Sequence, residues 1–381
     1  MKIFLIGILF FCFLSLQAQQ VLVGIFSQQS TNVVFFTPTH GSYKVFEDSN
    51  ELGEILVDHT LKINLKEKEL YFTINEKSYS AKAIKIVSQD VASSFKIKAN
   101  TVTRNYDDNL KLKALSKSIQ LVNDVALEHY VGGVVESEAG YHHALEYYKL
   151  QAILCRTYAL KNFHRHEEEG YHLCDAVHCQ AYYSKTHKIK AVKKAIDSTA
   201  GLIIADKHLE LIDATFHSNC GGQTCNSEDV WSKQLPYLRS VKDTFCIHSR
   251  NAKWKKVMHK DKWNKYLLSY GIHHNQDTII NGEKYYVCPS GRQASVCFPD
   301  GKIKAAQIRN DFHFRSAFFV VKAKNDSVYI IGRGYGHGVG LCQEGAMVMA
   351  KNGYSYQAII DFYYKDIIVL SLKNLAFFKE N

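Results

Sequence analysis

Two glutamates, Glu136 and Glu138, end an otherwise apolar and glycine-containing stretch, "YVGGVVESEAG", at residues 130–140. The apolar residues before them are spaced i, i+3, i+4, i+7 and i+8 from Leu127, which predicts one face of a helix. At about 100° per residue, Glu138 falls on this buried face and Glu136 faces outward. A carboxyl group in apolar surroundings keeps its proton to a higher pH, as a general acid requires. The alternative is a glutamate that pairs with a base or simply ends the helix.

Arg156 lies in a second predicted helix, "HALEYYKLQAILCRTYALKNF", at residues 143–163. This segment is apolar around most of its circumference, which predicts a buried helix. Arg156 shares a face with Ala152 and Ala159, two small residues that leave room for it. A buried guanidinium needs an anion, either Glu138 or an anionic ligand. The alternative is an arginine whose charged end reaches the surface.

A short loop, "HLCDAVHC", places His172, Cys174, His178 and Cys179 within eight residues. Two thiolates and two imidazoles are a complete tetrahedral ligand set for zinc. Because protein side chains would fill every position, such a zinc would be structural. His166 or His164 is an alternative to His172, and a Cys174–Cys179 disulfide with uninvolved histidines is an alternative to the metal.

The segment "GRGYGHGVG" carries glycine at every second position from 332 to 340. It lacks the spacing and the βαβ context of a dinucleotide fingerprint, so no nucleotide cofactor is expected. In an extended segment, glycines at this spacing permit close approach of another chain or a ligand and would offer a flat bed to a sugar strand, and His337 would then face the groove. The alternative for His337 is a packed histidine bonded to backbone. Trp231 and Tyr237 are suited to stacking on sugar rings, or equally to core packing.

The elements that must position these residues predict an α+β fold. Short β-branched and aromatic runs make residues 19–105 a β-rich N-terminal region, and residues 107–125 continue as strand. A mixed domain over residues 106–375 follows, with buried helices packed on antiparallel strands. Beyond the two helices above, the sequence predicts helices at 190–199, 344–353 and 355–364 and strands at 202–206, 209–218 and 366–372.

Residues 1–18 have the features of a secretory signal peptide: Lys2, an apolar run and Ala18 before the expected cleavage site. An exported protein is therefore expected, periplasmic or extracellular and associated with the cell wall. Without this segment the chain has 46 basic and 37 acidic residues, a net charge of +9. That charge suits an anionic partner such as nucleic acid, anionic lipid or cell-wall polymer.

The exported chain would keep nine cysteines, an odd number, so at least one thiol stays free or binds metal. Cys288 and Cys297 bracket a turn-rich loop, which predicts a disulfide across a hairpin. Cys220 and Cys225 bracket "GGQT", and Cys246 is close to them in sequence.

From about residue 103 to 370, the chain resembles the stage II sporulation protein D/LytB family. The resemblance rests on "NDVALEHYVGGVVESEAG", "LQAILCRTYALKN", "LCDAVHCQAYY", "FHSNCGGQTCNSEDVWSKQLPYLRSV" and "GRGYGHGVGLCQEGAMVMAKNGYSYQAIIDFYYKDI", in the family's order. It implies cell-wall remodelling. It also implies Glu138 as the catalytic acid, Arg156 as the functional arginine and zinc in the cysteine–histidine loop. Tyr237, Trp231, His337 and Gln343 are the expected substrate-binding residues.

Two functions are consistent with that resemblance. The preferred one is a lytic transglycosylase that cleaves peptidoglycan glycan strands at N-acetylmuramic acid to give 1,6-anhydro products. A single acid suffices because the sugar's own C6 hydroxyl attacks, and intramolecular attack has a large effective molarity. Glu228 or Asp229 remains an alternative second acid. The other function is a non-catalytic wall-binding protein that stimulates a cell-wall amidase. Nucleic-acid binding rests on charge alone, and no nucleic-acid partner is expected.

Overall fold

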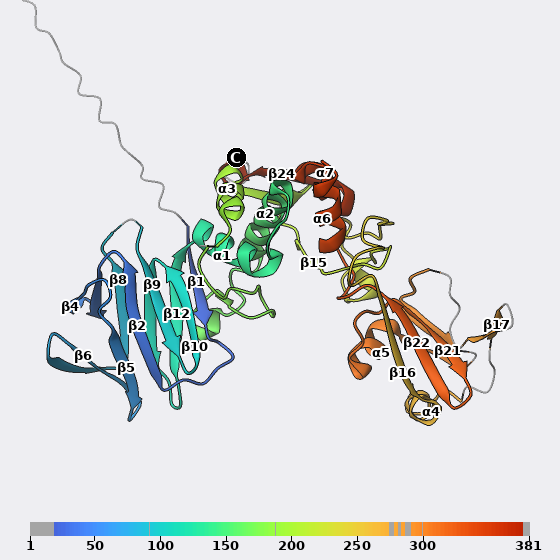
Figure 1. Cartoon of the computed structure of the whole chain (residues 1–381), viewed down its shortest axis with the longest axis horizontal. Coiled ribbons are helices and arrows are strands. Elements are labelled where there is room, and N and C mark those ends of the chain that lie inside the picture. Colours follow the sequence, from blue (N-terminus) through green and yellow to red (C-terminus); the bar gives the residue numbers. More distant parts are fainter. Residues whose placement is uncertain are drawn as a thin grey trace, which may run out of the picture. The chain divides into compact units, whose positions relative to one another are not determined.

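The computed structural model describes residues 19–90, 92–186, 188–273, 278–280, 283–285, 291–298 and 300–375 (Figure 1). The predicted signal peptide at residues 1–18 lies outside this part, and so does Cys288 of the predicted Cys288–Cys297 disulfide. The chain forms two compact units that divide within helix α1, between Tyr130 and Val131.

The first unit consists of antiparallel strands. They are β1 (Gln20–Ile25), β2 (Val33–His40), β3 (Tyr43–Glu47), β4 (Asn50–Ile55), β5 (Leu61–Lys66), β6 (Glu69–Ile74), β7 (Lys77–Ala81), β8 (Ala83–Ser88), β9 (Ser94–Ala99), β10 (Val102–Asp107), β11 (Asn109–Ala114) and β12 (Ile119–Ala126). One sheet contains the run β1-β12-β11-β8-β3-β4, and the other has the order β10-β9-β2-β5-β6-β7.

The two sheets bury their inner faces against each other. Tyr43 from β3 packs against Phe36 and Phe95 of the other sheet, with ring centroids 5.2 and 5.8 Å apart. Side chains alternate between buried and exposed along β9 and β6, as expected for sheets with one solvated face. Strands β10 to β12 pair within this unit, although they follow residue 105, where sequence patterns placed the end of the N-terminal region.

The helices lie in the second unit, apart from the first turn of α1. They are α1 (Leu127–Ala139), α2 (Leu145–Lys161), α3 (Lys190–Ser198), α4 (Lys260–Leu268), α5 (Ala305–Phe312), α6 (Gln343–Lys351) and α7 (Tyr356–Tyr363), with 3-10 turns η1 (Glu167–Glu169) and η2 (Ser227–Asp229). Helix α2 is buried along most of its length and contacts α3, α6, α7 and β14 (Figure 1).

Apart from β13, the strands of the second unit belong to several smaller sheets. They are β13 (Leu173–Cys174), β14 (Leu202–Asp206), β15 (Phe216–His217), β16 (Lys253–His259), β17 (Thr278–Ile280), β18 (Glu283–Tyr285), β19 (Ser295–Phe298), β20 (Gly301–Lys304), β21 (Phe319–Lys324), β22 (Ser327–Arg333), β23 (Leu341–Cys342) and β24 (Ile367–Ser371). β14 pairs with β24 antiparallel, whereas β15 and β23 form a short parallel pair.

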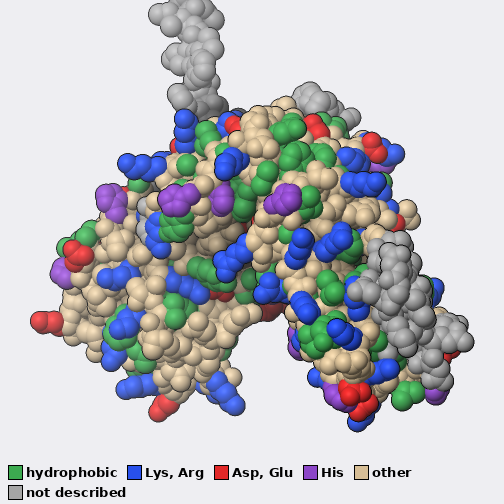
Figure 2. All heavy atoms as spheres, turned by 45° about the vertical axis from the view of Figure 1, so that its right-hand side comes forward, with side chains coloured by type: hydrophobic (Ala, Val, Ile, Leu, Met, Phe, Trp, Pro, Cys, Tyr) green, Lys and Arg blue, Asp and Glu red, His purple; other side chains and the backbone are tan. Residues whose placement is uncertain are grey.

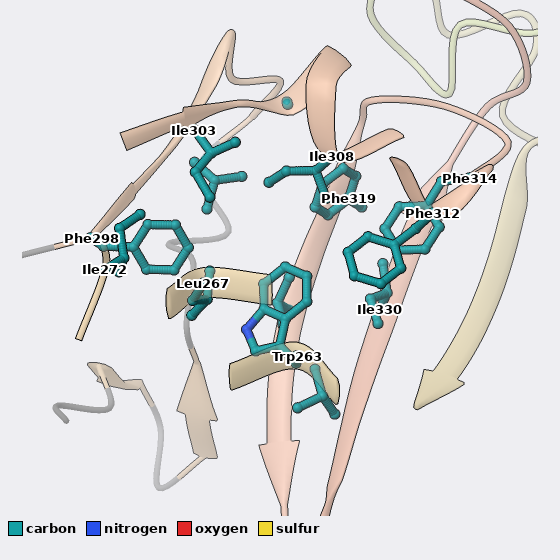
Figure 3. Close-up of a cluster of buried hydrophobic side chains, with 14 of the residues drawn as sticks. Trp263, Leu267, Ile272, Phe298, Ile303, Ile308, Phe312, Phe314, Phe319 and Ile330 are labelled. Carbon is teal, nitrogen blue, oxygen red and sulfur yellow. The ribbon is translucent and has the colours of Figure 1, made fainter. Parts of the chain in front are cut away.

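A separate hydrophobic core lies in the stretch from β16 to β22. Trp263 of α4 is fully buried and packs against Phe312 at the end of α5, with Ile330 of β22 in the same cluster (Figure 3). This core stabilises the sheet β16-β22-β21-β18-β17 without involving the residues expected to do chemistry.

The α+β class predicted from sequence is confirmed, with a strand-rich N-terminal unit and buried helices in the second. Lys and Arg side chains are spread over the face shown in Figure 2, where Asp and Glu are sparse. In the described part of the chain, every helix is too short or too polar to cross a membrane.

Candidate active site

A groove in the second unit brings together residues from four distant parts of the sequence. Its volume is about 640 Å³. The lining residues are Glu138, Tyr158, Val177, His178, Cys179, Gln180, Ala214, Thr215, Phe216, His217, Ser218, Trp231, Tyr335, Gly336, His337 and Gln343. The predicted site residues that line this groove are Glu138, Trp231, His337, Gln343, His178 and Cys179.

Glu138 is the acidic side chain in this lining. It is the penultimate residue of α1, and its Oε1 accepts a hydrogen bond of 2.9 Å from the backbone N–H of Ala181. Burial raises the pKa of this carboxyl group above its usual range, and the Ala181 N–H opposes part of that rise by stabilising the charged form. The side chain is thus largely removed from solvent, as its place on the apolar helix face predicted.

Two glycines in α1 let the segment that carries Ala181 lie against the helix. A Cβ atom on Gly133 would lie 2.4 Å from the carbonyl oxygen of Ser184 and 2.5 Å from the ring of Tyr182. Glycine is unfavourable inside a helix by about 1 kcal/mol relative to alanine. Close packing of the 181–186 segment, which places the Ala181 N–H at Glu138, explains why the helix tolerates it.

Glu136 does not face solvent as the helical count predicted. It is half-buried, and its carboxylate accepts hydrogen bonds of 3.1–3.2 Å from the backbone N–H groups of Lys188 and Ile189. Ile189 is the N-cap of α3, where N–H groups lack helical partners. Glu136 therefore anchors the start of α3 rather than taking part in the groove.

His337 lines the groove with its ring while backbone groups occupy both of its nitrogens. Nε2 lies 2.9 Å from the carbonyl oxygen of Phe216, and Nδ1 accepts from the N–H of Val339 at 3.1 Å. Burial lowers the pKa of His337 to about 4. The imidazole is therefore neutral near pH 7 and has no free nitrogen for proton transfer. His337 is therefore the packed, backbone-bonded histidine of the alternative interpretation, and it also lines the groove as predicted.

Three rings form a continuous wall beside it. The centroid of the His337 ring lies 5.3 Å from that of Trp231 and 5.3 Å from that of His217. Trp231 is 38% exposed, and Tyr335 and Val177, which also line the groove, are 46% and 79% exposed. Exposed apolar and aromatic surface in a groove marks a binding site.

The glycines of "GRGYGHGVG" do not form the extended bed expected from their spacing. Gly334, Gly336, Gly338 and Gly340 all have positive φ, between 70° and 109°. A Cβ atom on Gly340 would lie 2.2 Å from the carbonyl oxygen of Thr215, and one on Gly336 would lie 2.9 Å from Cβ of His217. The glycines thus admit another segment of the same chain, residues 215–219, and this contact creates the histidine wall.

Tyr237 lies away from the groove. It is 5% exposed, and its hydroxyl group accepts from the N–H of Asp213 at 3.1 Å and lies 3.3 Å from that residue's Oδ2. The alternative weighed for this aromatic residue, core packing, describes it, so the structure offers no support for the predicted substrate contact.

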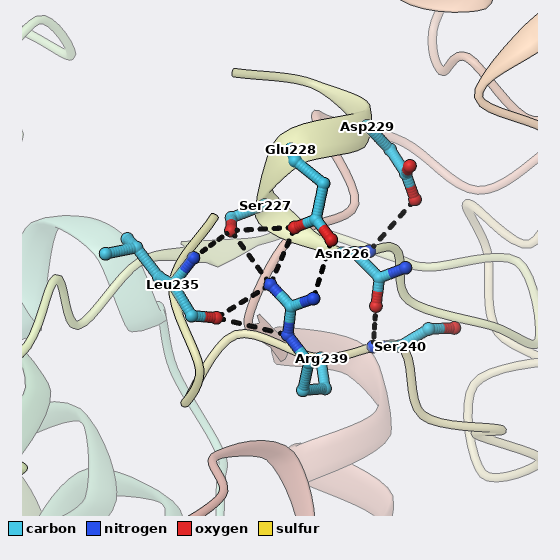
Figure 4. A network of polar contacts seen from close by, with 7 residues as sticks. All are labelled: Asn226, Ser227, Glu228, Asp229, Leu235, Arg239 and Ser240. Atoms are coloured by element: carbon cyan, nitrogen blue, oxygen red, sulfur yellow. Dashed lines mark hydrogen bonds and ion pairs between the residues drawn. The ribbon is translucent and has the colours of Figure 1, made fainter. Parts of the chain in front are cut away.

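The two candidates for a second acid form hydrogen bonds with neighbouring residues of the same loop (Figure 4). Glu228 receives two hydrogen bonds from Arg239, of 2.6 and 2.7 Å, which lower its pKa to about 2. Asp229 accepts from the backbone N–H of Asn226 at 3.3 Å in the capping box of η2. Neither residue is among those lining the groove in the described part of the chain.

Arg156 is fully buried and lies behind the groove rather than in its wall. Its Nη1 donates to the carbonyl oxygen of Leu202, the first residue of β14, at 2.9 Å, and more weakly to that of Ala152. The neighbouring Thr157 accepts from the N–H of Ile204 at 3.0 Å. Arg156 thus helps to hold β14 against α2, and the surface alternative is wrong.

The cysteine–histidine loop gathers four possible metal ligands, and His166 takes the place predicted for His172. Ligand atoms of His166, Cys174, His178 and Cys179 lie within 4.8 Å of one another. The ring of His172 stacks on Phe163 instead, with centroids 3.7 Å apart. The 3-10 turn η1 reverses the chain between α2 and the loop, which brings His166 to the cysteines.

The ligand spacing fits zinc. The Cys179 Sγ atom lies 3.5 Å from His166 Nε2 and 3.7 Å from His178 Nδ1, and Cys174 Sγ lies 3.9 Å from His178 Nδ1. A tetrahedron with zinc–sulfur and zinc–nitrogen bonds of usual length has sulfur–nitrogen edges of about 3.6 Å. The other nitrogen of His166 contacts Glu169 at 2.5 Å, the carboxylate–histidine arrangement common behind zinc ligands. Cys174 and Cys179 are free thiols in the structure.

Sequence reasoning missed three features of the groove. The Ala181 N–H is a backbone group, so the residue type at this position gives no sign of its role. The sequence signal for His217 was its place in "FHSNCGG", shortly before a glycine pair, and Thr215 lies two residues before it. His217 Nε2, Thr215 Oγ1 and Gln343 Nε2 are buried polar atoms without a hydrogen-bond partner among the described residues. A buried polar atom without a partner is costly, so these atoms are candidate ligand contacts.

An α+β fold with a buried carboxyl group in an aromatic-walled groove defines a protein with a candidate active site. A profile of the family described as stage II sporulation protein matches residues 115–205. The chain is 31% identical to stage II sporulation protein D of Bacillus subtilis over 266 residues, covering 65% of this chain and 75% of that protein. The chain belongs to the stage II sporulation protein D family.

Two further relatives extend the comparison. An uncharacterized protein of Brachyspira hyodysenteriae is 26% identical and aligns over 87% of this chain and 88% of its own length. The amidase enhancer of Bacillus subtilis is 24% identical over 61% of this chain but only 39% of its own length.

Proposed function

We propose that this protein is an exported lytic transglycosylase that cleaves peptidoglycan glycan strands during cell-wall remodelling. The observation that carries the proposal is Glu138, a carboxyl group with a raised pKa that the Ala181 N–H holds in a groove of about 640 Å³. Family membership and the net positive charge of the chain, which suits an anionic wall polymer, support the same reading.

The reaction needs only the proton of Glu138. The carboxylic acid gives that proton to the glycosidic oxygen as the bond from C1 of N-acetylmuramic acid to this oxygen breaks. The C6 hydroxyl oxygen of the same sugar then bonds to C1, and its proton returns to the Glu138 carboxylate. The products are a free 4-hydroxyl group and a 1,6-anhydro sugar, and the enzyme regains its starting form. No water or second carboxylate is needed, in agreement with the engagement of Glu228 by Arg239.

The groove offers complementary surfaces for a glycan. The exposed rings of Trp231 and Tyr335 present flat apolar faces of the kind that stack on sugar rings. Gln343 and His217 have buried polar atoms that need partners, and the hydroxyl and acetamido groups of the substrate would supply them. His337 contributes shape rather than proton transfer, because backbone groups hold both of its nitrogens.

We also propose that a zinc ion, held by His166, Cys174, His178 and Cys179, braces this groove. Zinc would supply structural rigidity rather than catalysis, because protein ligands fill all four positions. Cys179 is two residues before Ala181, so the loop that these ligands order carries the N–H bound to Glu138.

Product analysis tests the proposed reaction. The protein purified without its signal segment would be incubated with peptidoglycan glycan strands, and the products weighed by mass spectrometry. Anhydro-muropeptides or anhydro-sugars should accumulate with wild type and be absent with Glu138→Gln, whose amide cannot donate a proton as an acid does. Glu136→Gln is the matched control, two residues away on the same helix, and should keep the activity. Equal product from wild type and Glu138→Gln would reject Glu138 as the acid.

Similarity to an amidase enhancer favours one alternative, a wall-binding protein that stimulates a cell-wall amidase. The same variant separates the two functions. A stimulator should raise the amidase rate equally with Glu138 or Gln at this position and release no anhydro product by itself. Loss of stimulation in Trp231→Ala, with Glu138→Gln unaffected, would assign the groove to binding alone.

A further inference from the structure

A second group of metal-binding side chains lies outside the cysteine–histidine loop. Ligand atoms of Cys220, Asp243, Cys246 and Cys342 lie within 4.8 Å of one another, and all four residues are buried. Sγ of Cys220 is 3.4 Å from Sγ of Cys246 and 3.2 Å from Oδ2 of Asp243. We infer that these four residues bind a second structural zinc ion, through three thiolates and one carboxylate.

The donor set is right for zinc. Thiolates select zinc over the hard cations, and Cys₃ sets completed by one further ligand are tetrahedral zinc sites. A zinc tetrahedron has sulfur–sulfur edges of about 3.8 Å, so ligand atoms already this close need to move by only tenths of an ångström. Loading would release the thiol protons to solvent, as for any thiolate site.

The surroundings of the four residues resemble the hydrogen-bonded shell of a metal site. Sγ of Cys342 accepts backbone N–H groups from Cys220 at 3.3 Å and from Gly345 at 3.4 Å. The Asp243 carboxylate accepts the hydroxyl of Tyr363 at 2.8 Å and the N–H of Phe245 at 2.9 Å. Such outer contacts orient ligands and spread their negative charge.

Asp243 is the residue that a cluster without metal does not explain. Its carboxyl group is fully buried beside three sulfur atoms, and its contacts in the described part of the chain are hydrogen-bond donors rather than a cation. A buried carboxylate is costly without a positive partner. One disulfide among three cysteines would leave both a thiol and this carboxylate uncompensated, whereas one zinc ion uses all four groups.

The site would tie together three segments, two of which contribute residues to the groove. Cys220 follows β15, whose residues Phe216 and His217 line the groove, and Cys342 is the N-cap of α6, directly before the lining residue Gln343. The loop with Asp243 and Cys246 joins them. A second zinc would therefore fix the spacing between the histidine wall and Gln343, independently of the cysteine–histidine loop.

Metal counting with paired variants tests this inference. The zinc content of the protein, purified without added metal, would be measured by elemental mass spectrometry. Cys174→Ser, which breaks the first ligand set, should retain one zinc per chain. Cys174→Ser/Cys342→Ser should retain none. Cys174→Ser/Cys225→Ser, which removes a buried cysteine outside both sets, should still hold one. A zinc-free Cys174→Ser protein would overturn the inference.

A second measurement on wild type keeps the test valid if a variant fails to fold. Cadmium-113 loaded in place of zinc reports its sulfur ligands by its NMR shift, and a resonance in the range of three-thiolate coordination is expected. Absence of that resonance, or a disulfide joining any two of Cys220, Cys246 and Cys342 in unreduced peptides, would contradict the second site whatever the first cluster binds.

Discussion

The carboxyl group of Glu138 accepts a hydrogen bond of 2.9 Å from the backbone N–H of Ala181, 43 residues further along the chain. This contact joins the end of α1 to the loop that contains Cys174, His178 and Cys179. Burial raises the pKa of Glu138 because it favours the protonated form, and this N–H group lowers it because it favours the ionised form. The proposed chemistry therefore depends on how firmly the loop is held.

The pH dependence of activity and of stability should both follow Glu138. Activity should fall as the pH rises through its raised pKa, because the acid must start protonated. A carboxyl group with a raised pKa in the folded state contributes stability that is complete below the unfolded pKa and is lost as the pH rises through the folded one. Glu138→Gln should thus gain melting temperature relative to wild type as the pH rises above about 4, the usual pKa of a glutamate. A constant difference above that pH would contradict the raised pKa.

Gly133→Ala should weaken both the fold and the site. The added methyl group would meet the backbone oxygen of Ser184, which moves only with the whole 181–186 segment. The free energy of unfolding should fall by about 1–3 kcal/mol, measured by chemical denaturation. Gly132→Ala is the matched control, because its nearest neighbour is the hydroxyl end of Thr186. A loss from Gly133→Ala no larger than that from Gly132→Ala would show that the Ser184 backbone gives way as easily as the Thr186 hydroxyl.

His166→Ala should remove the zinc proposed for the cysteine–histidine loop, while His172→Ala should keep it. The structure places the His166 nitrogen 3.5 Å from Cys179 Sγ and stacks His172 on Phe163. Zinc content and melting temperature are the readouts: His166→Ala should hold one zinc ion per chain fewer than His172→Ala and should melt at a lower temperature. Zinc loss in His172→Ala alone would restore the original ligand assignment.

Trp231→Ala should weaken glycan binding more than it slows bond cleavage. Loss of one stacking ring from the groove wall should raise KM about tenfold, the equivalent of roughly 1.4 kcal/mol, with a smaller change in kcat. Tyr237→Phe serves as the comparison, because it loses a hydroxyl contact to Asp213 outside the groove. It should lower stability and leave KM unchanged. A raised KM in Tyr237→Phe would place that residue back among the substrate contacts.

Arg156→Lys should destabilise the protein while sparing the chemistry of folded molecules. Lysine keeps the charge but loses the planar donor group that reaches Leu202 of β14, so the free energy of unfolding should fall by about 1–3 kcal/mol. Activity corrected for the folded fraction, with an unchanged pH profile, identifies Arg156 as a structural contact. A shifted pH profile would show that it positions Glu138.

Local patterns in the sequence determined the helices that carry the chemistry. The apolar spacing from Leu127 placed Glu138 on the inner face of α1, and residues 143–163, apolar around most of the helix circumference, predicted the burial of α2. These properties were predictable because helical periodicity is set by neighbours within one or two turns.

Only the tertiary structure decided which residues meet. His166 rather than His172 reaches the cysteines because η1 turns the chain back. Glu136 binds the start of α3 because residues 188 and 189 return to α1. His217 joins His337 and Trp231 because positive-φ glycines admit the 215–219 segment. Each of these contacts depends on how the chain turns back between the partners, which local periodicity does not specify. The groove, its orphaned polar atoms and the second thiol cluster are therefore properties of the folded chain.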